Sequence, residues 1–274
     1  MAITEWNTLR TGSSDEVVLL VDFSAEASRM TAGFSNLVPL LPERYTVRAP
    51  QRAAWTGETD GGAGAAARLE QWLATADQFG AEVVAVLGYC AGCRLSAAFA
   101  DRLTGPTPPA VVFLDPLPVF PETLLHEYQE AVNGLAPDLE PAVVELATRQ
   151  AQDRVGTAAD LTELATWLSG SYRALAVEGC RKLGIDDEFT EQLVARLTDY
   201  LQYLTIAAAA PPPRSAPDLV LRSNTPMPSV LTQEYPAAEL VDVPRADLLG
   251  SREVADLVTR VLSADAAGAG EHRS

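Results

Sequence analysis

EVVAVLGYCAG, residues 82–92, is the stretch that decides how this chain folds. After Glu82, residues 83–87 form an apolar run rich in β-branched valine, which is typical of a buried strand. A Gly-x-Cys-x-Gly turn follows, and a helical pattern extends from Arg94 to about Leu103. A strained turn between a strand and a helix needs small flanking residues, because the two backbones approach closely there. The pattern therefore predicts that Cys90 is a nucleophile presented on a sharp turn.

The position of Cys90 also predicts an anion-stabilising environment. Its sulfur should lie at the N-terminus of the following helix, where backbone N–H groups and the helix dipole favour a thiolate. The same N–H groups can receive an oxyanion during acyl transfer. We expect the N–H of Ala91 to be one donor, and the second to come from the loop after the first strand, near Ser24 and Ala25.

Two other interpretations of the cysteines remain open at this level. Cys90 and Cys93 form a C-x-x-C pair, which in an α/β protein can be a redox dithiol. The flanking glycines and the lack of a preceding tryptophan favour the nucleophile instead. A zinc site would need a second Cys pair or a His cluster, so we expect no metal. Cys93 and Cys180 are expected to be small buried hydrophobes, and a purely structural role for Cys90 stays possible.

The rest of the sequence predicts an α/β fold with a mostly parallel central sheet. Apolar strand patterns alternate with helical ones, which is typical of a parallel sheet covered on both faces. The expected strands are residues 17–21, 45–49, 82–87, 110–114, 219–222 and 239–243, followed by a last helix over 252–262.

Residues 116–213 show helical periodicity only. Nearly one hundred residues without a strand are too many for a crossover connection, so we expect a helical cap inserted into the sheet domain. The predicted organisation is a core of 1–115 and 214–265, a cap of 116–213 and a disordered tail of 266–274.

Charge and hydropathy narrow the class of partner. The formal net charge is -17, which repels polyanions, so we expect no nucleic-acid partner. No run approaches the roughly 18 apolar residues of a membrane span, and the first residues do not resemble a signal peptide. The expectation is a cytoplasmic protein that is not bound to membranes. Three cysteines do not make a disulfide framework.

Taken with the turn at Cys90, the chain resembles the thioesterase domains of polyketide and non-ribosomal peptide assembly lines, which have the α/β-hydrolase fold. The resemblance covers residues 17–25, the Cys90 turn, Val111–Asp115, the cap, and the final strand and helix. In polyketide-type members the catalytic aspartate ends the strand after the nucleophile's helix, which assigns that role to Asp115. Asp115 beside Pro116 is also compatible with simple capping of a turn.

The chain departs from this family at the catalytic histidine. The family's histidine follows the last strand, in a segment that corresponds to residues 243–249, VPRADLL, and Asp247 stands where it would be. His126 and His272 are the chain's two histidines, and His272 lies in the tail. His126 falls in the first helix expected in the cap, from where it is a candidate base. A surface histidine is an equally good interpretation.

A thioesterase uses its base twice, first on the nucleophile and then on water. Without the family histidine, acylation of Cys90 stays feasible while hydrolysis slows, because a cysteine depends less on a base than a serine does. In this respect the chain resembles the stand-alone cysteine-dependent Dieckmann cyclases of tetramate and pyridone pathways.

This resemblance implies an enzyme that takes a β-ketoacyl-aminoacyl chain from an acyl or peptidyl carrier protein. The ring would close on acyl-Cys90, with no cofactor beyond the carrier's phosphopantetheine. The alternatives are a type II-like thioesterase or acyl shuttle that uses the same cysteine, and a degenerate, non-catalytic homologue.

Overall fold

The computed structural model describes residues 6–23, 33–51, 61–76, 78–105, 107–226 and 238–268. The chain divides into two compact units. The sheet unit contains the described residues of Met1–Ala54, Ala65–Pro118 and Ala210–Ser274. The helical unit contains those of Trp55–Gly64 and Val119–Ala209, compared with the expected cap of 116–213.

The sheet has seven strands in the order β1-β3-β2-β4-β5-β6-β7. Neighbouring strands pair in parallel, except that β1 is antiparallel to β3. The strands are β1 Trp6–Arg10, β2 Glu16–Val21, β3 Thr46–Pro50, β4 Glu82–Tyr89, β5 Ala110–Leu114, β6 Leu219–Arg222 and β7 Glu239–Leu240. The central strands β2, β4 and β5 are buried over most of their length because helices cover the sheet on both faces.

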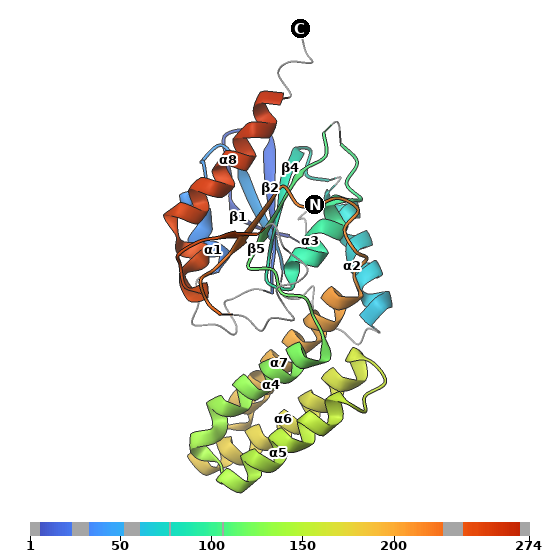
Figure 1. The fold of residues 1–274 in the computed structure, drawn as a ribbon, viewed down its shortest axis with the longest axis vertical. Helices are drawn as coiled ribbons and strands as arrows, with labels where there is room; N and C mark the ends of the chain where they lie inside the picture. The colour runs from blue at the N-terminus through green and yellow to red at the C-terminus, as the bar shows by residue number, and fades with distance from the viewer. Residues whose placement is uncertain are drawn as a thin grey trace. The chain divides into compact units, whose positions relative to one another are not determined.

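Helices α1 and α8 lie on one side of the sheet, and α2 and α3 lie on the other (Figure 1). The helices of this unit are α1 Phe34–Leu37, α2 Gly61–Ala76 from Ala65 onwards, α3 Gly92–Ala100 and α8 Arg252–Gly268, with the short 3-10 helices η2 Val38–Leu40 and η6 Arg245–Gly250. Aromatic packing fixes the edge strand β1 to the layer formed by α2 and α3. The ring of Trp6 lies 5.4 Å from that of Trp72 in α2 and 5.8 Å from that of Phe99 in α3.

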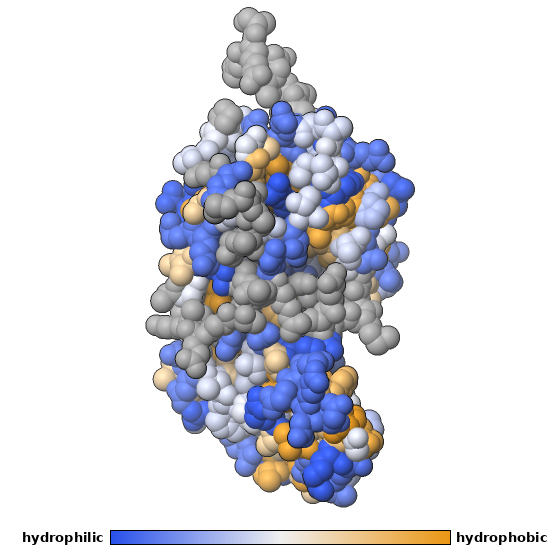
Figure 2. All heavy atoms as spheres, turned by 180° about the vertical axis from the view of Figure 1, so that it is seen from behind, coloured by the Kyte–Doolittle hydropathy of each residue, from blue (hydrophilic) through white to orange (hydrophobic). Residues whose placement is uncertain are grey.

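The helical unit is an all-α assembly in which α6 packs on both α4 and α7. Its elements are α4 Pro121–Leu135, η4 Ala136–Asp138, α5 Pro141–Val155, α6 Leu161–Leu183 and α7 Asp187–Ala209. Helix α6 has well-formed ends: the Asp160 carboxylate accepts from the Glu163 N–H at 2.8 Å, and Gly184 ends the helix with a left-handed φ of 69°. Apolar patches interrupt the hydrophilic surface of this unit (Figure 2).

The fold class predicted from the sequence is confirmed: an α/β chain with a mostly parallel sheet and a helical insertion. The antiparallel edge strand β1 was not predicted, and β7 has two residues rather than five. The expected disordered tail of 266–274 was wrong in its first part, because α8 continues to Gly268. Its Ala-rich end sustains helix formation, and 269–274 lie outside the described residues. Within the described ranges, no helix is long and apolar enough to cross a membrane.

Candidate active site

Cys90 follows the last residue of β4 and directly precedes the turn into α3. Its φ of 55° is in the left-handed region, which costs a non-glycine residue on the order of 1 kcal/mol. The cysteine N–H donates to the carbonyl of Leu114 at 3.0 Å, and its carbonyl accepts from Leu117 at 3.3 Å. The neighbouring strand β5 therefore holds the turn in its strained conformation.

Gly88 shows why this turn needs a residue without a side chain. A Cβ at Gly88 would lie 2.4 Å from the Cα of Cys93 and 2.4 Å from the Oγ of Ser96. Contacts that short do not occur between real atoms, so β4 and α3 approach one another only because position 88 is glycine. The first glycine of the Gly-x-Cys-x-Gly pattern thus has a direct steric cause in the folded protein.

Asp115 follows the end of β5 and is only 1% exposed. It too has a positive φ, of 48°, and its N–H donates to the carbonyl of Leu221 at 2.8 Å. Ser223 holds the carboxylate at both oxygens: its N–H donates to Oδ1 at 3.2 Å and its Oγ donates to Oδ2 at 3.0 Å. These bonds orient Asp115 as a fixed anion in the interior of the sheet unit.

Arg245, the first residue of η6, contacts both Cys90 and Asp115. Its Nη2 donates to the Sγ of Cys90 at 3.2 Å, and its Nε lies 3.3 Å from Oδ2 of Asp115. The Tyr89 side chain forms a further hydrogen bond with this guanidinium. The guanidinium of Arg245 thus lies between the sulfur of Cys90 and the buried carboxylate of Asp115.

The segment that carries Arg245 is bound to the loop after β6. The Arg245 N–H donates to Oγ1 of Thr225 at 2.8 Å, and the Asn224 N–H donates to the carbonyl of Val243 at 3.0 Å. The Nδ2 of Asn224 also donates to a carboxylate oxygen of Asp242 at 2.8 Å. These three bonds fix the register of the segment and bring position 245 over the turn.

Electrostatics explain why Arg245 stays charged although its side chain is mostly enclosed. Burial by itself would lower the pKa of Arg245. The neighbouring Cys90, Tyr89 and Asp115 outweigh that effect and raise the pKa of the guanidinium above its ordinary value.

Cys93 lies in a different environment from Cys90. Its Sγ donates to the carbonyl of Gly88 at 3.2 Å, and the residue packs against Ala97, Phe113 and Val220. Burial raises the pKa of the Cys93 thiol well above its ordinary value, and the nearby Cys90 raises it further. A protonated, hydrogen-bonded thiol is a poor nucleophile, which weakens the dithiol interpretation of the C-x-x-C pair.

The structure brings together Cys90, Ala91 and Asp115 from the set of residues expected at the site. Ala91 is buried and directly precedes α3. Asp247 lies two residues beyond Arg245 on η6 and has an exposed side chain. His126 is an exposed residue of α4, in the helical unit. Ser24 and Ala25, the expected second oxyanion donor, lie outside the described residues.

Sequence reasoning missed Arg245, Ser223 and Tyr89. Arg245 stands in the same segment, 243–249, in which Asp247 was chosen because it occupies the place of the family's histidine. The observed β7 is shorter than expected, and the Arg245 N–H is bound to Thr225. A buried-anion argument would have favoured the arginine, since Asp115 requires a cationic partner.

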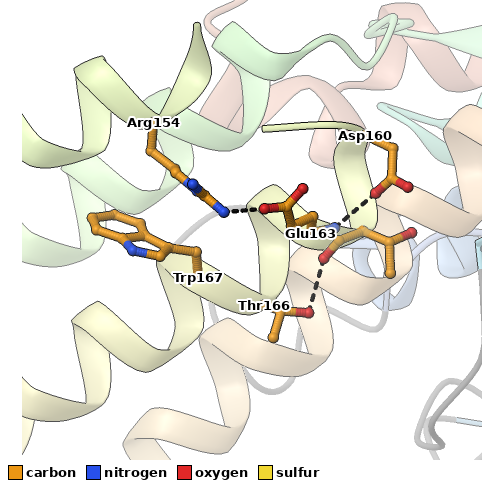
Figure 3. Close-up of a pocket in the computed structure, with 6 residues that line it drawn as sticks. Arg154, Asp160, Glu163, Thr166 and Trp167 are labelled. Carbon is orange, nitrogen blue, oxygen red and sulfur yellow. Dashed lines mark hydrogen bonds and ion pairs between the residues drawn. The ribbon is translucent and has the colours of Figure 1, made fainter. Parts of the chain in front are cut away.

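Two surface hollows occur in the helical unit, and both are lined only by its own residues. One, of about 510 Å³, is lined by Arg154, Asp160, Thr162, Glu163, Thr166 and Trp167 (Figure 3). The other, of about 450 Å³, follows α5 and α6 and shares Thr166 and Trp167. An ion pair between Arg154 and Glu163 crosses the first hollow. No group of three or more His, Cys, Asp or Glu side chains among the described residues could hold a metal ion.

Comparison with known proteins bears on the fold. No protein-family model matches the chain, and no curated protein matches it. It is similar to AB3403, a four-domain nonribosomal peptide synthetase bound to AMP and glycine, with a TM-score of 0.53 and 13% identity over 94% of this chain and 20% of that one. The chain has the α/β-hydrolase fold.

Two further solved structures match with lower TM-scores. The Vlm2 thioesterase domain bound with a dodecadepsipeptide has a TM-score of 0.49 and 16% identity over 94% of this chain and 98% of that one. An α/β hydrolase from Sphaerobacter thermophilus has a TM-score of 0.46 and 15% identity over 93% of this chain and 95% of its own. In an α/β-hydrolase fold the nucleophile stands on the strand-to-helix turn, which is where Cys90 lies.

Proposed function

We propose that this chain processes acyl thioesters in natural-product biosynthesis through an acyl-enzyme on Cys90. The strained turn, the guanidinium of Arg245 beside the Cys90 sulfur and the fold support the proposal. Acylation needs a nucleophile with anionic character and donors for the oxyanion. Cys90 supplies the first, and the start of α3 at Ala91 supplies N–H groups for the second.

The observation that carries the proposal further is the guanidinium of Arg245 between Cys90 and Asp115. A thioesterase that hydrolyses its acyl-enzyme needs a base to activate water, and an arginine has no acceptor and stays protonated. Arg245 can therefore stabilise the thiolate of Cys90 but cannot take a proton from water. The site favours an acyl-enzyme that is released by a better nucleophile than water.

The release step that fits best is attack by a carbon of the bound chain itself. A methylene between a ketone and an amide is far more acidic than water, so it becomes a nucleophile without a strong base. Its attack on the acyl-Cys90 carbonyl is a Dieckmann cyclisation, which gives a tetramate from a glycine-type unit and a pyridone-type ring from a β-alanine-type unit. Ring closure within one chain gains several kcal/mol from proximity.

A second candidate, an acyl shuttle between two carrier proteins, is favoured by the same contact. A carrier thiol also needs little base, and a thiolate that approaches acyl-Cys90 would meet the same guanidinium. In both functions the substrate arrives on a phosphopantetheine carrier, and the acyl group is transferred to Cys90 as a covalent intermediate. The two functions differ only in the group that releases it.

Intact-protein mass spectrometry after mixing with a carrier-bound β-ketoacyl-aminoacyl thioester tests the proposal. We expect a mass adduct that maps to Cys90, decays with the appearance of cyclic product, and is absent in Cys90→Ala. An adduct that decays only when a second carrier thiol is added would establish the shuttle. Decay to the linear acid would make the chain a hydrolase, and no adduct at all would exclude the acyl-enzyme.

A further inference from the structure

Arg245 is placed to do more than replace a histidine. Its Nη2 lies 3.2 Å from the nucleophilic sulfur of Cys90, while its Nε is held 3.3 Å from Asp115. Asp115 is in turn fixed at both oxygens by Ser223. The ion pair of Nε with Asp115 therefore fixes the guanidinium, while Nη2 faces the sulfur of Cys90. A group that cannot accept a proton acts there through its charge and its donors.

Resting on the proposed acyl-Cys90 chemistry, the geometry points to Arg245 as the catalytic residue that holds one negative charge through the whole cycle. The charge begins on the Cys90 sulfur, moves to the departing carrier sulfur, then to the enolate of the substrate, and returns to Cys90. The guanidinium stays within reach of each of these sites because they all surround the same carbonyl carbon.

The first step transfers the acyl group. The Cys90 thiolate attacks the carbonyl carbon of the carrier thioester and forms a new C–S bond. The bond from that carbon to the phosphopantetheine sulfur breaks, and the electron pair leaves with this sulfur. Acyl-Cys90 and a carrier thiolate result, and no proton has moved.

The second step closes the ring. The carrier thiolate takes one proton from the methylene between the two carbonyls and becomes a thiol, and the methylene becomes an enolate. The enolate carbon attacks the acyl-Cys90 carbonyl and forms the C–C bond, while the C–S bond to Cys90 breaks. The electron pair returns to the Cys90 sulfur as thiolate. The only proton transferred runs from the substrate to its own leaving group, so the cycle needs no protein base.

Two features of a guanidinium suit it to this task. Its planar array of N–H donors matches two neighbouring oxygens, as in the enolate of a 1,3-dicarbonyl, whereas a lysine presents only a point charge. The same cycle disfavours hydrolysis, because the pKa of bulk water lies far above that of a thiol and a thiolate cannot remove its proton effectively. Donors already fixed by Asp115 cost no reorganisation when the charge moves.

The test uses Arg245→Gln, which removes the charge, and Arg245→Lys, which keeps the charge but removes the planar array of N–H donors, called the fork below. Arg252→Gln, an exposed arginine at the start of α8, is the matched control. The substrate is a pantetheine thioester of a β-ketoacyl-aminoacyl chain. Rapid-quench mass spectrometry gives the rate of Cys90 acylation, and chromatography gives the rate of ring closure. Circular dichroism checks that each variant folds.

We expect Arg245→Gln to lose roughly 10²-fold or more in both rates. Arg245→Lys should retain more of the acylation rate than of the ring-closure rate, and Arg252→Gln should match the wild type. The plot of Cys90 alkylation by iodoacetamide against pH should move to higher pH in Arg245→Gln, which a merely structural role would not cause.

Unchanged rates in Arg245→Gln, with acylation intact in the wild type, would overturn the role of Arg245 and leave the acyl-enzyme standing. A wild type that never acylates would instead remove the proposed function, and this inference with it. If Arg245→Gln does not fold, Arg245→Lys decides: a selective loss of ring closure supports the role of the fork, and wild-type rates in both steps refute it.

Discussion

Arg245 donates to the sulfur of Cys90 from a position 155 residues further along the chain. The contact places a permanent cation where a base would be needed for hydrolysis, and Asp115 holds that cation from the far side. Charge stabilisation and proton transfer are separate functions, and in the proposed acyl-enzyme chemistry Arg245 supplies the first without the second.

Arg245→His should turn the chain towards hydrolysis. An imidazole between Cys90 and Asp115 can accept a proton, so water becomes a competent nucleophile. We expect a larger share of linear acid among the products, measured as the ratio of acid to cyclic product by chromatography. The matched control is Asp247→His, an exposed position on the same 3-10 helix, which should leave the ratio unchanged. A similar rise in both variants would show that the imidazole need not contact Cys90.

Ser223→Ala should slow acylation of Cys90 by about tenfold, because a hydrogen bond to a charged group contributes about 1.5–3 kcal/mol. The variant loses the 3.0 Å bond from Oγ to Asp115 Oδ2 and keeps the backbone bond to Oδ1. Asp115 would then hold Arg245 less firmly. Ser223→Thr keeps the hydroxyl and should restore the rate. A Thr variant as slow as the Ala variant would point to a packing defect instead.

Cys93 should stay unmodified under conditions that alkylate Cys90. The raised pKa of the Cys93 thiol keeps it protonated at neutral pH, and only the thiolate reacts readily. Peptide mapping after iodoacetamide treatment is the measurement, and labelling of Cys93 should begin only well above pH 9. Cys93→Ala should keep turnover close to that of the wild type, whereas Cys90→Ala abolishes it. Equal losses in the two variants would revive the redox dithiol.

Tyr172→Phe should reduce the loss of the free energy of unfolding that the protein shows as the pH rises above 10. Burial raises the pKa of Tyr172 from 10.0 to about 12, and Cys180 adds to the shift. The folded state therefore holds the phenol proton more tightly than the unfolded state. This stabilisation is complete below pH 10, falls as the pH rises towards 12, and amounts to on the order of 2 kcal/mol.

Urea unfolding followed by circular dichroism measures this difference at several pH values. The difference in the free energy of unfolding between wild type and variant should be constant below pH 10 and should change above it. A gap that is the same at every pH would show that Tyr172 ionises alike in both states.

The sequence by itself determined the fold class and the sharp turn that presents Cys90, because both depend on local patterns. Apolar runs of strand length alternating with helical periods specify a covered parallel sheet, and the small residues around Cys90 specify the sharp turn. Asp115 could also be identified, since it directly follows a strand next to that of Cys90. The edge strand β1 escaped prediction because its exposed face breaks the apolar pattern.

Only the tertiary structure decided which residue stands between Cys90 and Asp115. The sequence offered Asp247 and His126, and the contact is made by Arg245. Its place depends on where a two-residue strand ends and on two hydrogen bonds, one that the Arg245 N–H donates to Thr225 and one that the Asn224 N–H donates to Val243, which no local pattern encodes. Leaving the buried carboxylate of Asp115 without a cation would cost several kcal/mol. The long-range ion pair therefore favours the loop conformation that brings Arg245 to Asp115.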